Sequence, residues 1–437
     1  MLRLLAALWL ASIPGAAAIA DDLMQIYQLA RENDPDAKIG VIDQAAAAEV
    51  RSQSIAQMLP NISFTADSSR NRLESQSFLG QTLQHFWNSS LGISLKQPVF
   101  HWEHWIGLDQ ADNKIAQAEA QNQAKQQDLM ARTAEAYFNV LAAQDYLTFS
   151  LAEKKAIEKQ LEQAKQRFDV GVIAITDVYE AQAGYDRATA SVIEAENTID
   201  NRKEALRQII GEHPAGLSAL GQSVPLGEPA PQDISAWAHS AESNNFSIVA
   251  QINQAEYIRK SIELQQAGHL PTVDLVAQYQ EQDNRNLYGL RGNTESFGLQ
   301  LNLPLFQGGG VASKVRQAEY AYQAAREELI KVKRSVNRQV KDAYRGVLTS
   351  INTVKALDTT VKSAELAVEA AEAGFEVGTR TMVDVLTVQR NLYKAKSDYA
   401  TSRYNYLING VKLKQAAGSL SEADLQDINR YLNKVSD

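Results

Sequence analysis

Cysteine is absent from this chain of 437 residues, so neither a disulfide framework nor a thiolate metal site can form. Basic side chains are in deficit, because 43 Lys and Arg face 52 Asp and Glu for a net charge of −9. Nucleic-acid binding usually needs a basic face, so nucleic acid is not expected as a partner. After the first twenty residues no apolar run of about eighteen residues occurs, and no transmembrane helix is predicted.

The N-terminus has the pattern of an export signal. Arg3 precedes a short apolar run, Leu4–Ile13, and small residues follow up to Ala20. This pattern predicts a secretory signal peptide at 1–20, cleaved after Ala20. The run is too short for a membrane anchor. Removing Arg3 would lower the net charge from −9 to −10. An exported chain of this kind is periplasmic, secreted, or an outer-membrane β-barrel protein.

Proline is missing from two long stretches, Ile115 to Ile210 and everything after Pro304. Both stretches are rich in Ala, Gln, Glu, Lys and Leu, which favour helix. Apolar side chains in them are spaced 4, 3, 4, and the spacing recurs 207 residues later: Ile157, Leu161, Ala164 and Phe168, then Ala364, Val368, Ala371 and Phe375. This heptad-like seam predicts long helices that pack lengthwise as coiled coils. Helices of this length do not fit within one compact domain.

The chain is a tandem repeat. FDVGVIAITDVYEAQ at 168–182 matches FEVGTRTMVDVLTVQ at 375–389 at six of fifteen positions, and shorter matches recur at offsets of 206 to 211. We therefore expect two copies, 21–229 and 230–437, each with the order β-β-α-α. Four of the ten prolines lie near the join, at 211–232. An irregular connection is expected there.

Each copy is expected to hold a helix hairpin, at about 111–210 and about 311–418. Gly171 and Gly378 follow helical runs and suit the left-handed residue that ends a helix, so they mark the hairpin turns. Asp177 with Glu180 resembles a helix-capping arrangement, and Thr381 with Asp384 has the same spacing. The simplest interpretation of Asp177 and Asp384 is therefore that they cap the return helices.

Each copy also has two segments that alternate apolar and polar residues, which predict strands at about 59–68, 87–100, 270–281 and 295–306. Polar, glycine-containing loops are expected at 67–82 and 281–294. The fold class is therefore α+β. A soluble sheet with helices on one face fits the pattern. A transmembrane barrel also fits, but needs about eight strands, so two chains would supply eight and three would supply twelve.

Two further motifs have residue types found in ligand sites. His101-Trp102-Glu103-His104 offers two histidines, but no third ligand is evident from the sequence, so no metal site is expected. Gly308-Gly309-Gly310 lacks the Lys and Ser/Thr of a phosphate loop and suits a bend between strand and helix. No nucleophile–base grouping stands out, so neither an enzyme nor a cofactor is predicted.

Three motifs carry a resemblance to a known family: Val170-Gly171 with 174–178, Val377-Gly378 with 379–386, and the run 403–409 (RYNYLIN). Together with the repeat, they resemble the TolC family of outer-membrane channel-tunnel proteins over nearly the whole chain, and match its TolC branch more closely than other efflux channels. The resemblance implies a homotrimer with a twelve-stranded outer-membrane barrel. It also implies a long periplasmic α-helical barrel and a mixed equatorial belt from about 211–236 and 419–437.

The resemblance also implies a function. Members of the family are exit ducts of tripartite efflux pumps and type I secretion systems, set in the outer membrane of Gram-negative bacteria among its lipids. They dock on a periplasmic adaptor protein and an inner-membrane transporter of RND or ABC type. Cargo is drugs or proteins, and the periplasmic tip is gated.

Site roles follow from the resemblance position by position. Asp384 is expected to form an acidic ring that selects cations, and Arg380 to latch the tip through Thr176 and Asp177 of neighbouring hairpins. Thr387 stands where the family has a second aspartate ring, and Phe375 stands where it has a gating tyrosine. We therefore expect a single ring and a latch that depends more on Arg380.

Two other functions remain open from the sequence alone. A periplasmic adaptor also has long helical hairpins, although duplicated strand pairs at this spacing are not expected of one. An exported glycan hydrolase would use paired carboxylates about 5–9 Å apart. Asp177 and Asp384 could approach each other only because the repeats pair.

Overall fold

The computed structural model describes residues 21–77, 80–214, 216–221, 224–284 and 291–432. The expected signal peptide at 1–20 and the last five residues of the expected belt lie outside the described residues. The chain divides into two compact units. We call Ile39–Gln123 with Phe246–Ser335 the sheet unit, and Met1–Lys38 with Ala124–Asn245 and Val336–Asp437 the hairpin unit. The long helices α3 (Trp102–Asp169) and α7 (Gly310–Glu376) contribute to both units.

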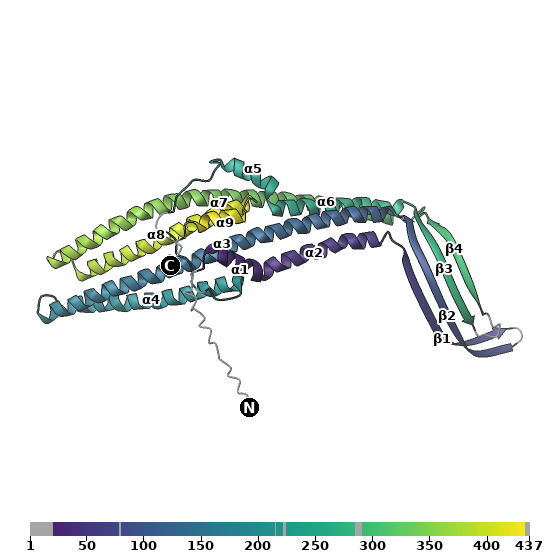
Figure 1. Ribbon diagram of the computed structural model, residues 1–437, viewed down its shortest axis with the longest axis horizontal. Coiled ribbons are helices and arrows are strands. Elements are labelled where there is room, and N and C mark those ends of the chain that lie inside the picture. Colours follow the sequence, from purple (N-terminus) through teal and green to yellow (C-terminus); the bar gives the residue numbers. More distant parts are fainter. Residues whose placement is uncertain (1–20, 78–79, 215, 222–223, 285–290, 433–437) are drawn as a thin grey trace, which may run out of the picture. The chain divides into compact units, whose positions relative to one another are not determined.

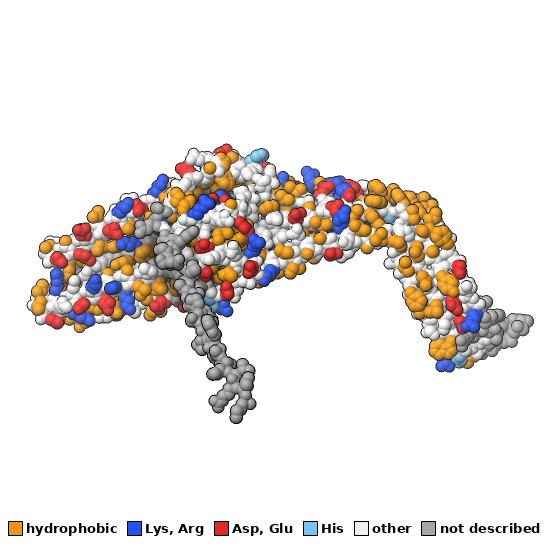
Figure 2. Space-filling view, viewed as in Figure 1, with side chains coloured by type: hydrophobic (Ala, Val, Ile, Leu, Met, Phe, Trp, Pro, Cys, Tyr) orange, Lys and Arg blue, Asp and Glu red, His pale blue; other side chains and the backbone are white. Residues whose placement is uncertain are grey.

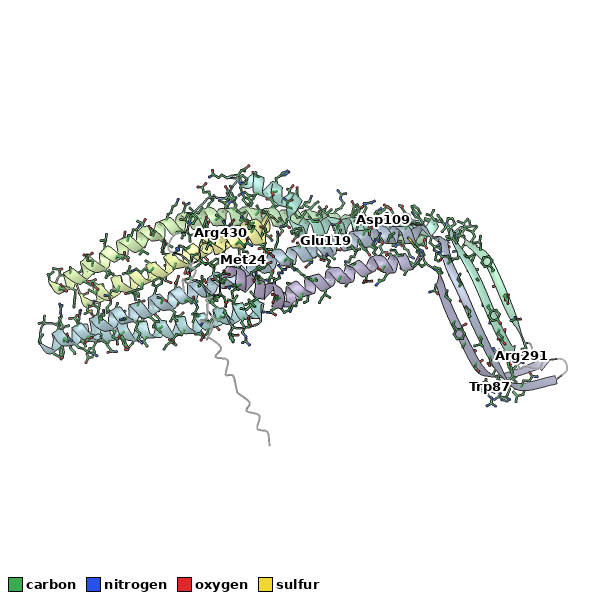
Figure 3. The ribbon with its side chains drawn as sticks, viewed as in Figure 1. Met24, Trp87, Asp109, Glu119, Arg291 and Arg430 are labelled. Carbon is green, nitrogen blue, oxygen red and sulfur yellow. The ribbon has the colours of Figure 1, made fainter. Side chains whose placement is uncertain are left out.

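The sheet unit contains one antiparallel sheet in the order β1-β2-β3-β4 (Figure 1). Its strands are β1 (Asn61–Ser77), β2 (Gly80–Phe100), β3 (Thr272–Asn284) and β4 (Arg291–Asn302). Helices α2 (Pro35–Ala56) and α6 (Phe246–Gln266), with the 3-10 turn Ala267–His269, complete the unit. Figure 3 labels Asp109 on α3. The Asp109 Oδ2 lies 3.0 Å from the Lys260 Nζ of α6.

Strands β1, β2 and β3 are longer than the sequence pattern predicted, whereas β4 has the expected length but begins and ends four residues earlier. The expected loop at 67–82 is mostly strand, because β1 and β2 stay paired from Asn61↔Lys96 to Ser77↔Gly80. In the same way, β3 runs on to Asn284 and β4 begins at Arg291, so the expected loop at 281–294 was also too long. Backbone ladder bonds need no apolar side chains, so polar residues can extend a hairpin that alternation does not reveal.

Apolar side chains face each other across the sheet and stay exposed. Phe64 pairs with Ile93, and Leu275 pairs with Leu299. Phe64 is 67% exposed and Leu299 is 71% exposed. Figure 2 shows hydrophobic side chains gathered along the strands. Among the described helices none covers this face, so a sheet buried under helices, one of the two interpretations from the sequence, is wrong.

The hairpin unit consists mainly of two helix pairs, α3 with α4 (Ile175–Ile210) and α7 with α8 (Met382–Ala416). The shorter helices are α1 (Leu23–Asn33), α5 (Ile234–Asn244) and α9 (Glu422–Asn429). The sequence pattern predicts none of the helices α1, α2, α5, α6 and α9. It also places the start of α3 at about residue 111, nine residues after the observed start at Trp102. A capping box of Asp22 and Gln25 marks the start of α1 and was a readable signal.

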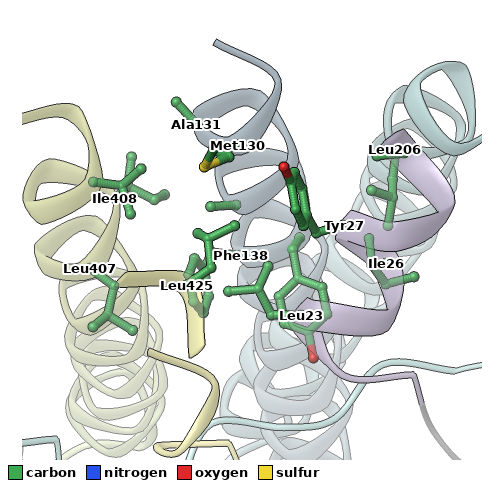
Figure 4. Packing of buried hydrophobic residues seen from close by; sticks show 14 of the residues in the cluster. Leu23, Ile26, Tyr27, Met130, Ala131, Phe138, Leu206, Leu407, Ile408 and Leu425 are labelled. Atoms are coloured by element: carbon green, nitrogen blue, oxygen red, sulfur yellow. The ribbon is translucent and has the colours of Figure 1, made fainter. Parts of the chain in front are cut away.

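The core of the hairpin unit gathers side chains from α1, α3, α4, α8 and α9 (Figure 4). Tyr27, Phe138, Leu206 and Leu425 are almost fully buried in it. Each large side chain buried in this way contributes about 1.5–3 kcal/mol. The core therefore joins short helices that are too small to be stable alone to the two long hairpins.

Buried polar side chains fix the irregular segments against this core. The Tyr137 hydroxyl donates to the Ser218 carbonyl at 2.8 Å, and the Gln127 amide donates to the Leu420 carbonyl at 2.9 Å. Both carbonyls belong to segments outside the named helices and strands, where side chains satisfy buried backbone groups. No helix in the described part of the chain is long and apolar enough to cross a membrane.

Gly418 offers a test of how the end of α8 is packed. Its φ is +74°, and an added Cβ would lie 2.7 Å from the Asn245 nitrogen and closer still to the Asn244 carbonyl. Gly171 has φ +76° with open space around it. We expect Gly171→Ala to cost about 1–2 kcal/mol of unfolding free energy, and Gly418→Ala about 1–3 kcal/mol more from overpacking. Thermal unfolding followed by circular dichroism measures both; equal losses would contradict the clash.

Candidate functional site at the two hairpin turns

The two hairpins turn by the same backbone device. Gly171 has φ +76° and Gly378 has φ +79°, in the left-handed region that glycine favours. Each glycine N–H donates to the carbonyl three residues before it, at 2.8 and 3.2 Å, and the next N–H donates five residues back, at 2.9 and 2.8 Å. This pair of bonds is a Schellman motif, so α3 and α7 end in the same way.

The return helices begin differently. The N-cap of α4 is Ala174, which has no side-chain hydrogen bond, and Asp177 is the third residue of that helix. The expectation that Asp177 caps α4 with Glu180 is therefore wrong, because the helix begins three residues earlier. The N-cap of α8 is Thr381, whose hydroxyl accepts the Asp384 N–H at 3.2 Å. The capping arrangement of Thr381 with Asp384 is confirmed.

The Asp384 carboxylate is held as an anion. Its Oδ2 accepts the backbone N–H and the hydroxyl of Thr381, each at 3.0 Å. These two bonds, the backbone one first, lower the pKa of Asp384, and the nearby charge of Arg380 adds to the effect. Because the folded pKa lies below the usual value of about 4, the stabilisation is present above that pH and is lost as the pH falls through the folded pKa. At neutral pH the group is a fixed negative charge.

Arg380 lies exposed in the loop between α7 and α8. Its backbone N–H donates to the Gly374 carbonyl at 3.2 Å, and its stem crosses Gly374 so closely that a Cβ there would lie 2.8 Å from the Arg380 Cγ. Within the described chain its guanidinium has no hydrogen bond or ion pair, and neither Thr176 nor Asp177 contacts it. The single chain therefore does not bring the expected latch residues together.

Phe375 lies where the two hairpins meet. Its ring packs on a small apolar cluster made by both hairpins: Leu161, Ala164, Val178, Ala181 and Met382. The Arg167 guanidinium carbon of α3 lies 5.3 Å from the centre of the ring. A cation over an aromatic face at an exposed site contributes about 0.5–1 kcal/mol. Phe375 thus joins the hairpins through apolar packing and this cation, without a hydroxyl.

Thr387 lines a groove between the hairpins. The groove has a volume of about 370 Å³ and is lined by side chains of α3, α4 and α8, among them Glu153, Arg187 and Arg390. Burial raises the pKa of Glu153, and the charge of Arg390 partly offsets that effect. Thr387 is one turn further along α8 than Asp384, so the two side chains occupy successive levels of the same helix.

Two motifs outside the hairpins also have defined surroundings. Gly308 and Gly309 have φ +61° and +79° directly before α7, as a bend requires. The structure places a third candidate ligand beside His101 and His104. The Glu103 carboxylate joins them, and one ligand atom from each residue lies within 4.8 Å of the others. Glu103 was visible in the motif, but only the folded turn places it beside both rings.

Comparison with known proteins decides the family. The model of the family described as outer membrane efflux protein matches residues 26–212 and 237–419. The chain belongs to this family. It is 39% identical to the outer membrane protein TolC of Vibrio cholerae, over 95% of each chain. It is 36% identical to TolC of Escherichia coli, over 95% of this chain and 86% of the relative.

More distant relatives agree with the assignment. The alkaline protease secretion protein AprF of Pseudomonas aeruginosa is 28% identical, over 94% of this chain and 87% of AprF. The outer membrane channel CmeC of Campylobacter jejuni has the same fold, with a TM-score of 0.78 over 94% of this chain and 90% of CmeC at 15% identity. The chain is therefore a TolC-family outer-membrane protein, and the adaptor alternative is wrong.

The unequal caps of the two hairpins lead to a prediction. Thr381→Ala removes the side-chain cap of α8 and should cost about 1 kcal/mol at that end of the helix. Amide exchange of the first turn of α8 should therefore speed up about fivefold, measured by hydrogen–deuterium exchange mass spectrometry. Ala174→Thr is the matched control, since it adds a cap to α4 and should slow exchange there. Unchanged exchange in both variants would show that the caps do not hold these turns.

Proposed function

We propose that this chain is an outer-membrane exit duct for efflux and type I secretion, gated where its two hairpins turn. The full-length match to TolC relatives carries the proposal. AprF, the protease secretion relative, supports the secretion role. The function is transport, and we infer no catalytic role for the chain and no cofactor. Its working partners would be a periplasmic adaptor and an inner-membrane transporter.

We propose that three copies assemble. In the described sheet, β1 pairs only with β2 and β4 only with β3, so each has an open edge. Open edges of long strands pair with further strands unless something blocks them. Three four-stranded sheets joined edge to edge give the twelve-stranded barrel expected of the family, with the apolar face toward lipid.

The gate roles rest on two features of the turns. The Arg380 guanidinium has no partner in its own described chain, so it is free to bond to Thr176 and Asp177 of a neighbouring copy. The Asp384 carboxylate is fixed and charged at neutral pH. Three such carboxylates around a narrow axis would attract cations. We therefore assign Arg380 to the latch and Asp384 to cation selectivity.

Conductance measured in planar bilayers tests these roles. The variants separate the charge of Asp384 from its hydrogen bonds at the N-cap of α8. Asp384→Asn keeps an oxygen for the Thr381 N–H but removes the charge, so cation selectivity should fall while the turn stays folded. Asp200→Asn is the matched control, because it removes an exposed carboxylate of α4 far from the turn that has no role in the latch. Arg380→Ala should enlarge the conductance steps, and Gly374→Ala should do so partly by displacing the Arg380 stem. Steps and selectivity equal to those of the wild type in all three gate variants would remove the gate assignment. No conductance from the wild type or from any variant would remove the channel.

The single acidic ring leads to a second prediction. A trivalent cation binds more tightly between two rings of carboxylates than at one, since each charge adds attraction. Thr387→Asp would add a second ring one turn from Asp384. We expect blocking by hexamminecobalt to become tighter by at least about tenfold, equivalent to 1.4 kcal/mol. Thr387→Asn is the uncharged control. Equal block in both variants would show that position 387 does not face the ion path.

A further inference from the structure

A compact group of ligand side chains lies where β2 ends and α3 begins. His101 follows the last residue of β2, and Glu103 and His104 lie in the first turn of α3. The His104 N–H donates to the His101 carbonyl at 3.1 Å. That turn stacks the two imidazole rings with centres 4.7 Å apart and planes 11° apart. Three different donor groups thus meet at one short segment of chain.

The spacing of the donor atoms suits a metal ion. His101 Nδ1 lies 3.0 Å from Glu103 Oε1. Two ligand atoms bound to one ion at bond lengths of about 2.0–2.1 Å are about 2.9–3.4 Å apart at octahedral or tetrahedral angles. His104 belongs to the same group, because one ligand atom from each of the three residues lies within 4.8 Å of the others. The two rings are nearly parallel in the stack, so metal binding requires the His104 ring to rotate out of it.

A buried carboxylate orients His101 from the other side. His101 Nε2 lies 3.0 Å from Asp274 Oδ1 on β3, and Asp274 is only 6% exposed. The other oxygen of Asp274 is fixed by Lys96, at 3.0 Å from Nζ. A histidine that binds a metal normally donates its second ring N–H to a carboxylate, which sets its tautomer. Asp274 provides this partner and leaves Nδ1 facing Glu103.

We propose that His101, Glu103 and His104 bind a divalent transition metal of the zinc class, with Asp274 as a positioning residue. Two imidazoles and one carboxylate suit zinc, cobalt or nickel, whereas magnesium and calcium prefer oxygen ligands alone. The ion binds the unprotonated Nδ1 of His101, so a proton held there is released to water on binding. Water completes the coordination. The ion would tie the end of β2 to the start of α3.

Cobalt binding tests the proposal on the full-length chain in detergent, purified with an affinity tag that contains no histidine and stripped with a chelator. We expect one Co²⁺ per chain, visible as absorption bands that Zn²⁺ removes and excess Mg²⁺ does not. Glu103→Gln and His104→Ala should lose this saturable binding. Asp274→Asn should weaken it about 10–100-fold, as the loss of an outer-shell partner does.

Two controls keep the result interpretable. His239→Ala removes an exposed histidine of the hairpin unit and should bind as wild type does. X-ray absorption of the zinc-loaded wild type needs no variant and should show two imidazole nitrogens at about 2.0–2.1 Å. No saturable binding below about 1 mM, binding that survives in Glu103→Gln and His104→Ala, or fewer than two imidazoles would each overturn the proposal.

Discussion

The hairpin unit depends on one patch of dense apolar packing. Toward the hairpin turns the long helices meet through a smaller cluster that forms a narrow seam, with Ala164 and Ala181 buried beside Leu161 and Val178. Around Tyr137 and Phe138, by contrast, large side chains from α1, α4, α8 and α9 close over α3. Helix pairs held by narrow seams can shift against each other, whereas a dense core resists rearrangement. This core is therefore the fixed point from which the hairpins extend.

The repeat is symmetric in backbone but unequal in chemistry. Both helices end in the same Schellman turn, and Asp177 and Asp384 occupy the same third position of the return helix. Only in the second copy does the N-cap residue, Thr381, have a side chain that hydrogen-bonds to the aspartate of the return helix, Asp384. In the first copy the N-cap is Ala174, so the half-buried Asp177 has no capping side chain to bond to. A repeat can thus keep its fold while one copy specialises.

The sheet unit has requirements that one chain does not meet. Its apolar face is exposed, and both outer strands have an open edge. Exposed apolar surface of this extent marks an interaction surface, since water penalises it. Membrane lipid on the face and neighbouring strands at the edges satisfy both needs together. The charged residues near the strand–helix junction, Lys96 and Asp274, are by contrast already paired within the chain.

The sequence by itself determined the periodic features. The seam that includes Phe168 and Phe375, and the glycines Gly171 and Gly378, follow from local propensity and spacing, so the hairpins and their turns were predictable. The tertiary structure decided which groups meet. Strand length depended on backbone hydrogen bonds between strands, which polar residues support as well as apolar ones do. Helix α4 begins at Ile175, directly after Ala174, which has no side-chain cap. Asp274 stands beside His101 although 173 residues separate them. No local pattern encodes such a contact, because it depends on how distant strands pair.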